Sequence, residues 1–216
     1  MMKIKVMDKI LAANDAWAEV NRKALKEKGI VMLNLIGSPG AGKTTLLEQT
    51  IDMLKKKKTM GVIEGDIATT KDAERIRKKG TAVYQINTGT ACHLDAHLVN
   101  AAYNELARDK TIELVFVENI GNLVCPAEFD IGEDAKVALL SVTEGDDKIE
   151  KYPLLFTEAK VLVITKIGLL KYTNFNVSYV KKVFKKLNPF APIVMVDSLT
   201  GDGLSTWVDF VLSLKK

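Results

Sequence analysis

The sequence has few of the residues that hold small secreted proteins together. Its 216 residues include only 2 cysteines, 5 prolines and 2 tryptophans. Two cysteines cannot build the disulfide framework typical of small extracellular domains. Apolar residues make up 47% of the chain and charged residues 27%, as in ordinary globular proteins. A chain of this length and composition can bury the core of one sizeable domain.

Long apolar runs and a strong charge of one sign are also missing. No stretch reaches the ~18 apolar residues of a membrane span, and the first residues are interrupted by charge too often for a secretory signal. We therefore expect a cytoplasmic protein with reduced thiols and no membrane partner. The formal net charge of +4 does not argue for a nucleic-acid partner, and the basic runs at 55–58 and 181–186 are expected on solvated helix faces.

Histidine is as scarce as cysteine, with 2 in the chain, yet both histidines and one cysteine lie together in ACHLDAHLV, residues 91–99. Thiolate and imidazole ligands suit Zn²⁺ or Ni²⁺. The spacing would place His93 and His97 on one face of a helix that starts near Cys92. The alternative is an ordinary helix with a buried thiol and two surface imidazoles. Cys125, the second cysteine of the chain, follows another predicted strand by a few residues and favours the metal site.

Apolar segments and helical patterns alternate from residue 30 to the end of the sequence. The strand-like segments are apolar throughout, which indicates that both faces of their sheet are covered. The pattern predicts an α/β fold with a mostly parallel sheet and helices on both faces. We expect residues 1–29 to form an amphipathic helix, with apolar positions at Ile10, Ala13, Trp17, Val20 and Leu25, and residues 30–216 to form one domain.

The first predicted strand runs directly into GSPGAGKTT, which matches the pattern G-x-x-x-x-G-K-[ST] in the strand–loop–helix context that it requires. The motif predicts a P-loop NTPase fold, with residues 30–216 as the nucleotide-binding domain. Glycines let successive backbone N–H groups point at one anion, and the following helix adds its positive end. Lys43 is expected to reach the β- and γ-phosphates, and the Thr44 hydroxyl to bind Mg²⁺. The residues expected to contact the nucleotide here are Gly37, Ser38, Pro39, Gly40, Ala41, Gly42, Lys43, Thr44 and Thr45.

Acidic residues end two of the other predicted strands. Glu64 and Asp66 end the segment VIEGD, and Glu118 ends VFVE. Ligands bind at the carboxyl ends of strands in open α/β sheets, so these acids should lie beside the phosphates. We expect Asp66 to hold Mg²⁺ together with Thr44, and Asp66 and Glu118 to act with Lys43 in catalysis. Which acid touches the metal directly stays open, and Asp72 is a further candidate for positioning water.

Five longer segments carry a resemblance to a known family. GSPGAGKTTLLE, VIEGDIATTKDAERI, NTGTACHLDAHLV, VENIGNLVCPAEFDIGE and LLSVTEGDDKIEKYPLLF resemble the HypB family of hydrogenase nickel-incorporation GTPases. The resemblance implies a slow GTPase that uses GTP and Mg²⁺, binds Ni²⁺ or Zn²⁺ and assists hydrogenase maturation proteins. It also implies a GTP-promoted homodimer with metal at the subunit interface. The matching ligands are Cys92, His93 and Cys125, with His97 as an additional one.

The sequence departs from this family at two places. Some members carry a cysteine-containing nickel motif or a histidine-rich tract near the N-terminus, whereas the first cysteine here is Cys92, so metal binding should rest on the interface site. The guanine-reading motif N-K-x-D is replaced by TKIG, in which Lys166 can lie along the base but Gly168 has no carboxylate. Losing that acceptor costs about 1.5–3 kcal/mol, so we expect weak guanine preference, improved by Gly168→Asp. Residues 197–203 resemble the remaining base-side loop.

Other functions use the same motifs. The urease accessory GTPase is a near relative of the HypB family and the first alternative. A small-molecule or nucleotide kinase shares the phosphate loop but usually has an arginine-rich lid, and the 4 arginines of this chain lie in no lid-like insertion. A structural zinc protein with a vestigial nucleotide loop is the third. We expect a metallochaperone in which slow GTP hydrolysis controls dimerisation.

Overall fold

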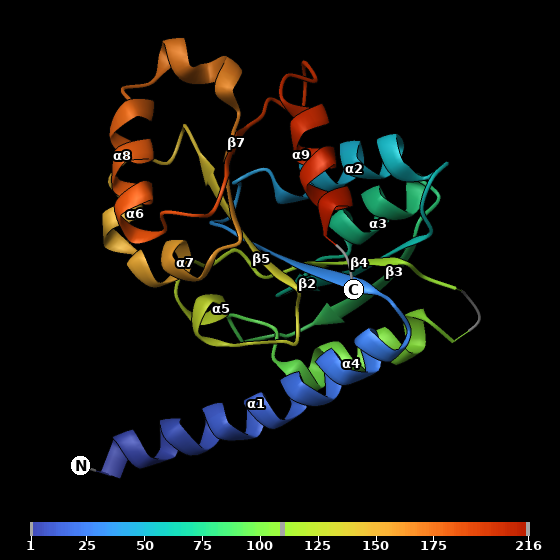
Figure 1. Ribbon diagram of the computed structural model, residues 1–216. Helices are drawn as coiled ribbons and strands as arrows, with labels where there is room; N and C mark the ends of the chain where they lie inside the picture. The colour runs from blue at the N-terminus through green and yellow to red at the C-terminus, as the bar shows by residue number, and fades with distance from the viewer. Residues whose placement is uncertain (1, 109–110, 215–216) are drawn as a thin grey trace.

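The computed structural model describes residues 2–108 and 111–214, with side chains from residue 9 onward, and strands alternate with helices along it (Figure 1). The strands are β1 (Val31–Ile36), β2 (Met60–Asp66), β3 (Ala82–Asn87), β4 (Leu114–Glu118), β5 (Ala135–Ser141), β6 (Val161–Thr165) and β7 (Ile193–Met195). The helices are α1 (Met2–Glu27), α2 (Lys43–Leu54), α3 (Lys71–Lys78), α4 (Ala96–Leu106), α5 (Cys125–Glu128), α6 (Lys148–Lys151), α7 (Pro153–Glu158), the 3₁₀ helix η1 (Ile167–Tyr172), α8 (Val177–Leu187) and α9 (Leu204–Ser213).

The strands form one sheet in the order β3-β2-β4-β1-β5-β6-β7. Every pairing in it is parallel, with Leu33 of β1 opposite Phe116 of β4 and Ala135 of β5. The predicted parallel α/β fold is thus confirmed. The chain adds β2 and β3 on one side of β1, returns through β4, and then adds β5 to β7 on the other side. Ligands bind in the crevice at the carboxyl ends of strands where the order reverses.

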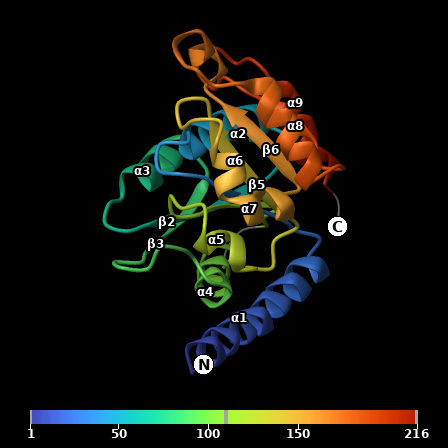
Figure 2. The ribbon, with the colours of Figure 1, turned by 90° about the vertical axis from the view of Figure 1, so that its left-hand side faces the viewer.

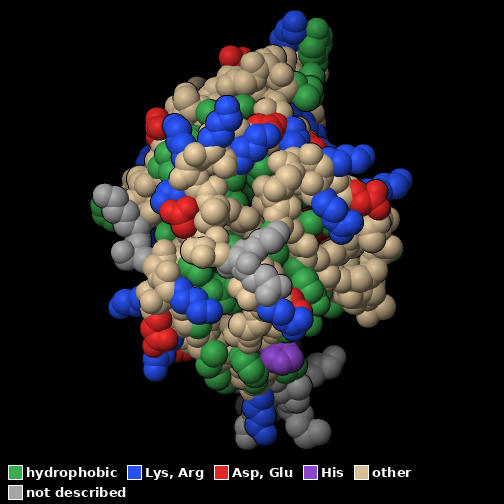
Figure 3. Space-filling view, turned by 90° about the vertical axis from the view of Figure 1, so that its right-hand side faces the viewer, with side chains coloured by type: hydrophobic (Ala, Val, Ile, Leu, Met, Phe, Trp, Pro, Cys, Tyr) green, Lys and Arg blue, Asp and Glu red, His purple; other side chains and the backbone are tan. Residues whose placement is uncertain are grey.

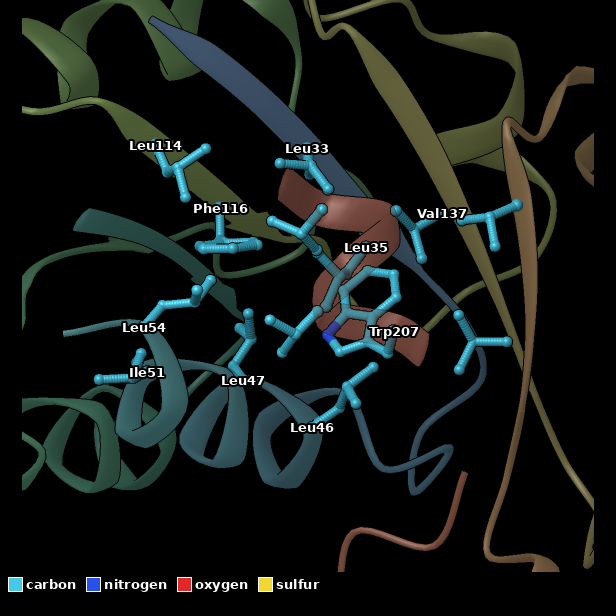
Figure 4. Packing of buried hydrophobic residues seen from close by; sticks show 14 of the residues in the cluster. Leu33, Leu35, Leu46, Leu47, Ile51, Leu54, Leu114, Phe116, Val137 and Trp207 are labelled. Carbon is cyan, nitrogen blue, oxygen red and sulfur yellow. The ribbon is translucent and has the colours of Figure 1, made fainter. Parts of the chain in front are cut away.

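Side chains of β1 alternate between two covered faces. Leu33 and Leu35 point to the face covered by α2 and α9, where Trp207 is fully buried among them (Figure 4). Met32 points to the opposite face, beneath α1 and α4, and Ile36 joins a third cluster with α7 and α8. Because both faces are covered, the strands contain apolar residues at nearly every position instead of alternating ones.

Helix α1 lies below the sheet against α4, and its first turns extend beyond the body of the molecule (Figures 1 and 2). The expected apolar positions are only partly buried: Ile10 is 47% exposed, Trp17 39% and Val20 50%, whereas Leu25 is 1% exposed. The buried positions include two asparagines, Asn14 and Asn21. The buried face of α1 therefore coincides only in part with the apolar positions read from the sequence.

Hydrogen bonds from these asparagines explain the orientation. Asn14 Nδ2 donates to the Asp130 carbonyl at 2.7 Å, and its Oδ1 accepts from the Ala96 amide at 2.9 Å. Asn21 Nδ2 donates to the Ala96 and Ile131 carbonyls at 2.8 and 3.0 Å. The Ala96 amide is one of the unpaired N–H groups at the start of α4. Satisfying buried backbone groups of α4 and the 130–131 loop therefore decides which face of α1 turns inward.

The surface carries charges of both signs. On the face shown in Figure 3, basic and acidic side chains are interspersed. In the basic run 55–58, Lys55 pairs with Asp52 and Lys58 with Glu113, each at 2.7 Å. In the described part of the chain, no helix is long and apolar enough to cross a bilayer.

Candidate nucleotide and metal sites

The phosphate loop connects β1 to α2 at the carboxyl edge of the sheet. Gly40 and Gly42 adopt left-handed conformations, with φ of 76° and 91°, which only glycine adopts without strain. Lys43, the first residue of α2, folds back so that its Nζ lies 3.4 Å from the Gly37 carbonyl and 3.3 Å from that of Ser38. An open pocket of about 480 Å³ lies against the loop. The loop thus has the shape and the cation that a polyphosphate requires.

Two buried carboxylates line the pocket from neighbouring strands. Glu64 of β2 lies opposite Glu118 of β4 in the sheet register, and they are 2% and 3% exposed. Thr44 Oγ1 donates to Glu118 Oε1 at 2.7 Å. The Oε2 atoms of both glutamates are buried and have no hydrogen-bond partner among the described residues. Buried carboxylate oxygens beside the Thr44 hydroxyl fit the donor set of Mg²⁺.

Burial and mutual repulsion change the acidity of this pair. Burial, followed by the charge of Glu118, raises the pKa of Glu64 to about 11. Burial also raises the pKa of Glu118, against the opposing effects of Lys43 and Thr44. Without a cation, Glu64 is therefore protonated at neutral pH. We did not include Glu64 among the catalytic residues, although an acid inside an otherwise apolar strand was the signal that could have identified it.

Asp66 lies at the mouth of the same pocket. Ligand oxygens of Glu64, Asp66 and Asp72 all lie within 4.8 Å of one another. Asp66 Oδ1 also accepts hydrogen bonds from the Ala68 and Thr69 amides, both at 2.7 Å. These bonds outweigh burial and lower the pKa of Asp66. The structure brings the expected acids together beside Lys43, while the assignment of Asp66 to magnesium stays a prediction.

Arg75 is a pocket residue that the sequence analysis missed. From α3 it pairs with Glu48 of α2 at 2.6 Å and with Asp72 at 2.9 Å, and it donates to Thr45 Oγ1 at 3.1 Å. Arg75 therefore ties α3 and Asp72 to the helix that carries the phosphate loop. No local pattern marks its role, because Glu48 and Thr45, which link it to α2, are distant in sequence.

The segment after β6 reaches the phosphate loop from the other side. Thr165 Oγ1 donates to the Ala41 carbonyl at 2.7 Å, and Lys166 Nζ donates to the Gly40 carbonyl at 2.6 Å. Lys166 has a φ of 59°, the one non-glycine residue with positive φ in the described part of the chain. Thr165 thus provides a side-chain tie to the loop although the expected asparagine is absent.

The candidate transition-metal site contains Cys92, His93 and Cys125. Ligand atoms of these three residues lie within 4.8 Å of one another. The two Sγ atoms are 3.0 Å apart, and Cys92 Sγ lies 3.8 Å from His93 Nδ1. Cys125 begins α5, next to the loop that follows β4. Residues 33 positions apart in sequence therefore present two thiols and an imidazole to one point.

The structure corrects two expectations about the histidines. Helix α4 begins at Ala96, where the Asp95 side chain caps it by accepting from the Leu98 amide at 2.8 Å. His93 therefore lies in the loop before the helix and does not share a helix face with His97. His97 lies outside the three-residue cluster, and its ring packs edge-on against Trp17 of α1 at 4.8 Å. The cap and the position of α1 separate the two imidazoles.

The surroundings of the cluster affect its protons. Burial lowers the pKa of His93, whose ring packs against Phe129 at 3.9 Å. Contact with the Cys92 thiol, followed by burial, raises the pKa of Cys125. The imidazole is therefore neutral at neutral pH, whereas the thiols must lose protons when a metal binds.

The donor chemistry fits a soft divalent metal but is incomplete in one chain. Tetrahedral coordination with Zn–S bonds of about 2.3 Å separates two sulfurs by about 3.8 Å, compared with 3.0 Å here. A side-chain rotation that increases the distance between the two sulfurs by less than about 1 Å would make room for the metal. Three described residues supply three ligands, and a structural tetrahedral site needs four.

Asn119 connects the two candidate sites. It follows Glu118 and is buried; its Oδ1 accepts from the Leu94 amide at 3.1 Å, and its Nδ2 donates to Asn34 Oδ1 at 3.1 Å. Asn122 Nδ2 adds a contact to the Cys92 carbonyl at 3.3 Å. The loop that follows Glu118 is therefore hydrogen-bonded to the loop that carries Cys92 and His93.

Comparison with known proteins agrees with this arrangement. Residues 31–195 match the family model described as CobW/HypB/UreG, nucleotide-binding domain. The hydrogenase maturation factor HypB of Escherichia coli K12 is 44% identical over 210 residues, covering 97% of this chain and 71% of that protein. The chain belongs to the HypB family. The hydrogenase/urease maturation factor HypB of Helicobacter pylori J99 is 42% identical and is aligned over 99% of this chain and 88% of its own length.

Solved HypB structures have the same fold. The crystal structure of HypB from Helicobacter pylori in complex with nickel is 40% identical, with a TM-score of 0.89 over 93% of this chain and 94% of the other. HypB from Archaeoglobus fulgidus is 41% identical, with a TM-score of 0.87 over 94% of this chain and 98% of the other. A LAO/AO transport system kinase, at 18% identity and a TM-score of 0.60 over 86% of this chain and 59% of the other, shares the fold alone. The HypB membership expected from the sequence motifs is confirmed.

Proposed function

We propose that this protein is a GTP-dependent metallochaperone that binds nickel or zinc and assists nickel insertion into [NiFe]-hydrogenase. The observation that supports this most directly is the direct connection between the two sites. Asn119 follows Glu118 of the phosphate pocket and accepts a hydrogen bond from Leu94, two residues from Cys92. A change at the nucleotide can therefore move the loop that carries two of the three metal ligands.

Hydrolysis in this proposal depends on positioned charge. Bound GTP would supply the phosphates, and Mg²⁺ would neutralise part of their charge. The phosphate-loop amides and Lys43 would hold the terminal phosphates. Thr44 with Asp66 and the Glu64–Glu118 pair would hold the cation, and Asp66 or Asp72 would orient water. Slow turnover suits a protein in which hydrolysis resets a switch.

The incomplete metal site supports a dimer. Each chain brings two thiols and one imidazole, so two chains meeting at this surface provide a bridged, thiolate-rich site that neither completes alone. Nucleotide that orders the loop after β4 then favours both dimerisation and metal binding. By linkage, metal must tighten the GTP-bound dimer by the same factor as GTP tightens metal.

The partners in this proposal are hydrogenase maturation proteins, and the location is the cytoplasm, where GTP is present and thiols stay reduced. Urease is the second candidate client, because the Helicobacter pylori relative is named for both hydrogenase and urease maturation. Adding nickel-loaded protein to each apo-enzyme with its accessory proteins separates the two clients by which activity appears.

The proposal is tested on the whole chain with Ni²⁺, Mg²⁺ and a non-hydrolysable GTP analogue. Light scattering gives the mass, and elemental analysis gives the metal in the dimer fraction. We expect Cys92→Ala and Cys125→Ala to lose most of the metal, His93→Ala to lose part, and all three to keep nucleotide binding.

His97→Ala is the matched control, because His97 contacts Trp17 outside the cluster. It should keep the metal of the wild type. Lys43→Ala should bind nucleotide poorly and should show no effect of the analogue on mass. Equal metal content in wild-type and Cys125→Ala dimers would refute the proposed metal site.

A further inference from the structure

A carboxylate from another loop occupies the space beside Gly168. The Gly168 amide donates to Asp197 Oδ2 at 2.9 Å. A Cβ atom added to Gly168 would lie 2.6 Å from the same oxygen, closer than any ordinary contact. The missing acid of the TKIG segment is thus replaced in space by Asp197, 29 residues later in the chain.

Asp197 is held rigidly by its own loop, which leads from β7 to α9. The Leu199 and Thr200 amides donate to its Oδ1 at 2.9 and 3.3 Å, and Asp197 is only 6% exposed. Burial works to raise the pKa of Asp197, but the three amides outweigh it and lower the pKa. The group is therefore an ionised acceptor at neutral pH. Each carboxylate oxygen can accept two hydrogen bonds, and Oδ2 accepts one from the described residues.

The position of this carboxylate is tied to the phosphate loop. Lys166, two residues before Gly168, takes a left-handed conformation and donates to the Gly40 carbonyl. Thr165 donates to the Ala41 carbonyl. A non-glycine residue with positive φ persists only where its surroundings hold it. Lys166 also lines the pocket at the phosphate loop, so the segment that contains Gly168 and bonds Asp197 adjoins that pocket.

We propose that Asp197 reads the guanine base in place of an aspartate at position 168, an inference that rests on the proposed binding of GTP. Guanine presents N1–H and a 2-amino group side by side. The open acceptor position on Oδ2 can take one of these donors, and Oδ1 can take the other by giving up its longer contact with the Thr200 amide, at 3.3 Å. Adenine has an acceptor at N1 and no 2-amino group, so it cannot pair in this way. Gly168 is then required, because a side chain at that position would displace the carboxylate.

This geometry reverses an expectation from the sequence. Gly168→Asp alone would force a carbon atom within 2.6 Å of Asp197 Oδ2 and would place two carboxylates together. We now expect that single substitution to weaken GTP binding. Guanine preference in the wild type should instead be strong.

The test is competition binding of GTP, ITP, XTP and ATP to the full chain with Mg²⁺. Wild type should prefer GTP to ATP, and GTP to ITP, which lacks the 2-amino group. Asp197→Asn should lose GTP affinity roughly ten- to a hundred-fold. It should gain relative affinity for XTP, because xanthine has an oxygen at C2 that accepts from the asparagine amide. Asp202→Asn, an exposed acid in the same loop, is the control and should keep the wild-type order.

A second variant covers the case in which Asp197→Asn fails to fold. The double variant Gly168→Asp with Asp197→Ser moves the carboxylate to position 168 and should recover GTP preference over ATP. If the wild type binds GTP and Asp197→Asn keeps the wild-type ratio of GTP affinity to XTP affinity, this inference alone is wrong. Asp197 then serves only to form its loop. A double variant without GTP preference likewise overturns this inference. Wild type that binds no nucleotide overturns the proposed function as well.

Discussion

Among single residues, the buried pair Glu64 and Glu118 carries the largest shift in proton affinity. The pKa of Glu64 rises to about 11 because the side chain is buried and faces Glu118. In the unfolded chain the same carboxyl titrates near 4.3, roughly. Because the folded-state pKa lies above the unfolded-state pKa, protonation of Glu64 contributes its full stabilisation at pH values below the unfolded-state pKa. That stabilisation is lost as pH rises toward the folded value, so the cation-free protein should become less stable from pH 5 upward.

Glu64→Gln isolates this effect in the nucleotide-free protein with chelator present. Glutamine is neutral in both states, so its free energy of unfolding lacks the contribution of Glu64 ionisation. The stability of Glu64→Gln relative to wild type should therefore increase between pH 6 and pH 8, by about 1–3 kcal/mol. Denaturant unfolding at several pH values measures the difference.

The exposed acid Glu158 provides the comparison, and Glu158→Gln should run parallel to wild type across this range. Parallel curves for Glu64→Gln and wild type would show that Glu64 is ionised in the folded protein, and our account of the pair would then be wrong.

At the scale of elements, the docking of α1 depends on polar contacts more than on apolar ones. Asn21 is buried and bonds the Ala96 and Ile131 carbonyls and the Asn100 side chain. Val20, its neighbour, is half exposed. Apolar periodicity alone does not identify the buried asparagines, because it has no means of counting unpaired backbone groups at the start of α4.

Asn21→Ala tests this docking. It leaves the Ala96 and Ile131 carbonyls and the Asn100 side-chain amide without this partner, which should lower the free energy of unfolding by about 1–3 kcal/mol. For a chain of this size that corresponds to a melting temperature lower by about 2–12 °C. Val20→Ala is the matched control and should change stability by less than about 0.5 kcal/mol. Thermal unfolding of both variants decides the matter, and equal melting temperatures would show that apolar contacts hold α1.

At the scale of the whole molecule, the central question is how nucleotide and metal sites communicate. The metal cluster lies on the loops after β3 and β4, and the loop after β4 also borders the nucleotide pocket. Asn119 bonds both loops with one side chain, to Leu94 and to Ile120, beside the contact from Asn122 to the Cys92 carbonyl. Two segments held by one side chain can shift together, which is the physical requirement for coupling between sites.

Asn119→Ala should separate the sites. The GTP analogue should increase the nickel affinity of the wild type by roughly 5- to 150-fold, the range typical of coupled sites. In Asn119→Ala the ratio of affinities with and without analogue should fall toward one, while each ligand still binds alone. Isothermal titration in all four combinations measures the ratio.

Asn104→Ala, which removes an exposed side-chain contact within α4, is the control and should keep the wild-type ratio. An unchanged ratio in Asn119→Ala would show that coupling runs through another contact or only through the dimer.

The sequence by itself determined the parallel sheet, the phosphate loop and the family. Buried parallel strands are continuous apolar runs, and the loop GSPGAGKTT contains all its own geometry within nine residues, so neither depends on distant segments. Cys92, His93 and Cys125 were also identifiable, because cysteine and histidine are rare in this chain and have a distinctive chemistry.

Only the tertiary structure decided which side chains from distant segments share a site. It separated His97 from the cluster, brought Arg75 to the phosphate pocket and placed Asp197 beside Gly168. Each outcome depends on where an element from another part of the chain packs, as Trp17 of α1 does against His97. A sequence pattern records spacing along the chain, whereas hydrogen bonding and steric exclusion depend on distances in space. The sequence therefore shows only that position 168 lacks an aspartate, whereas the structure shows that the carboxylate of Asp197, from another loop, lies beside that position.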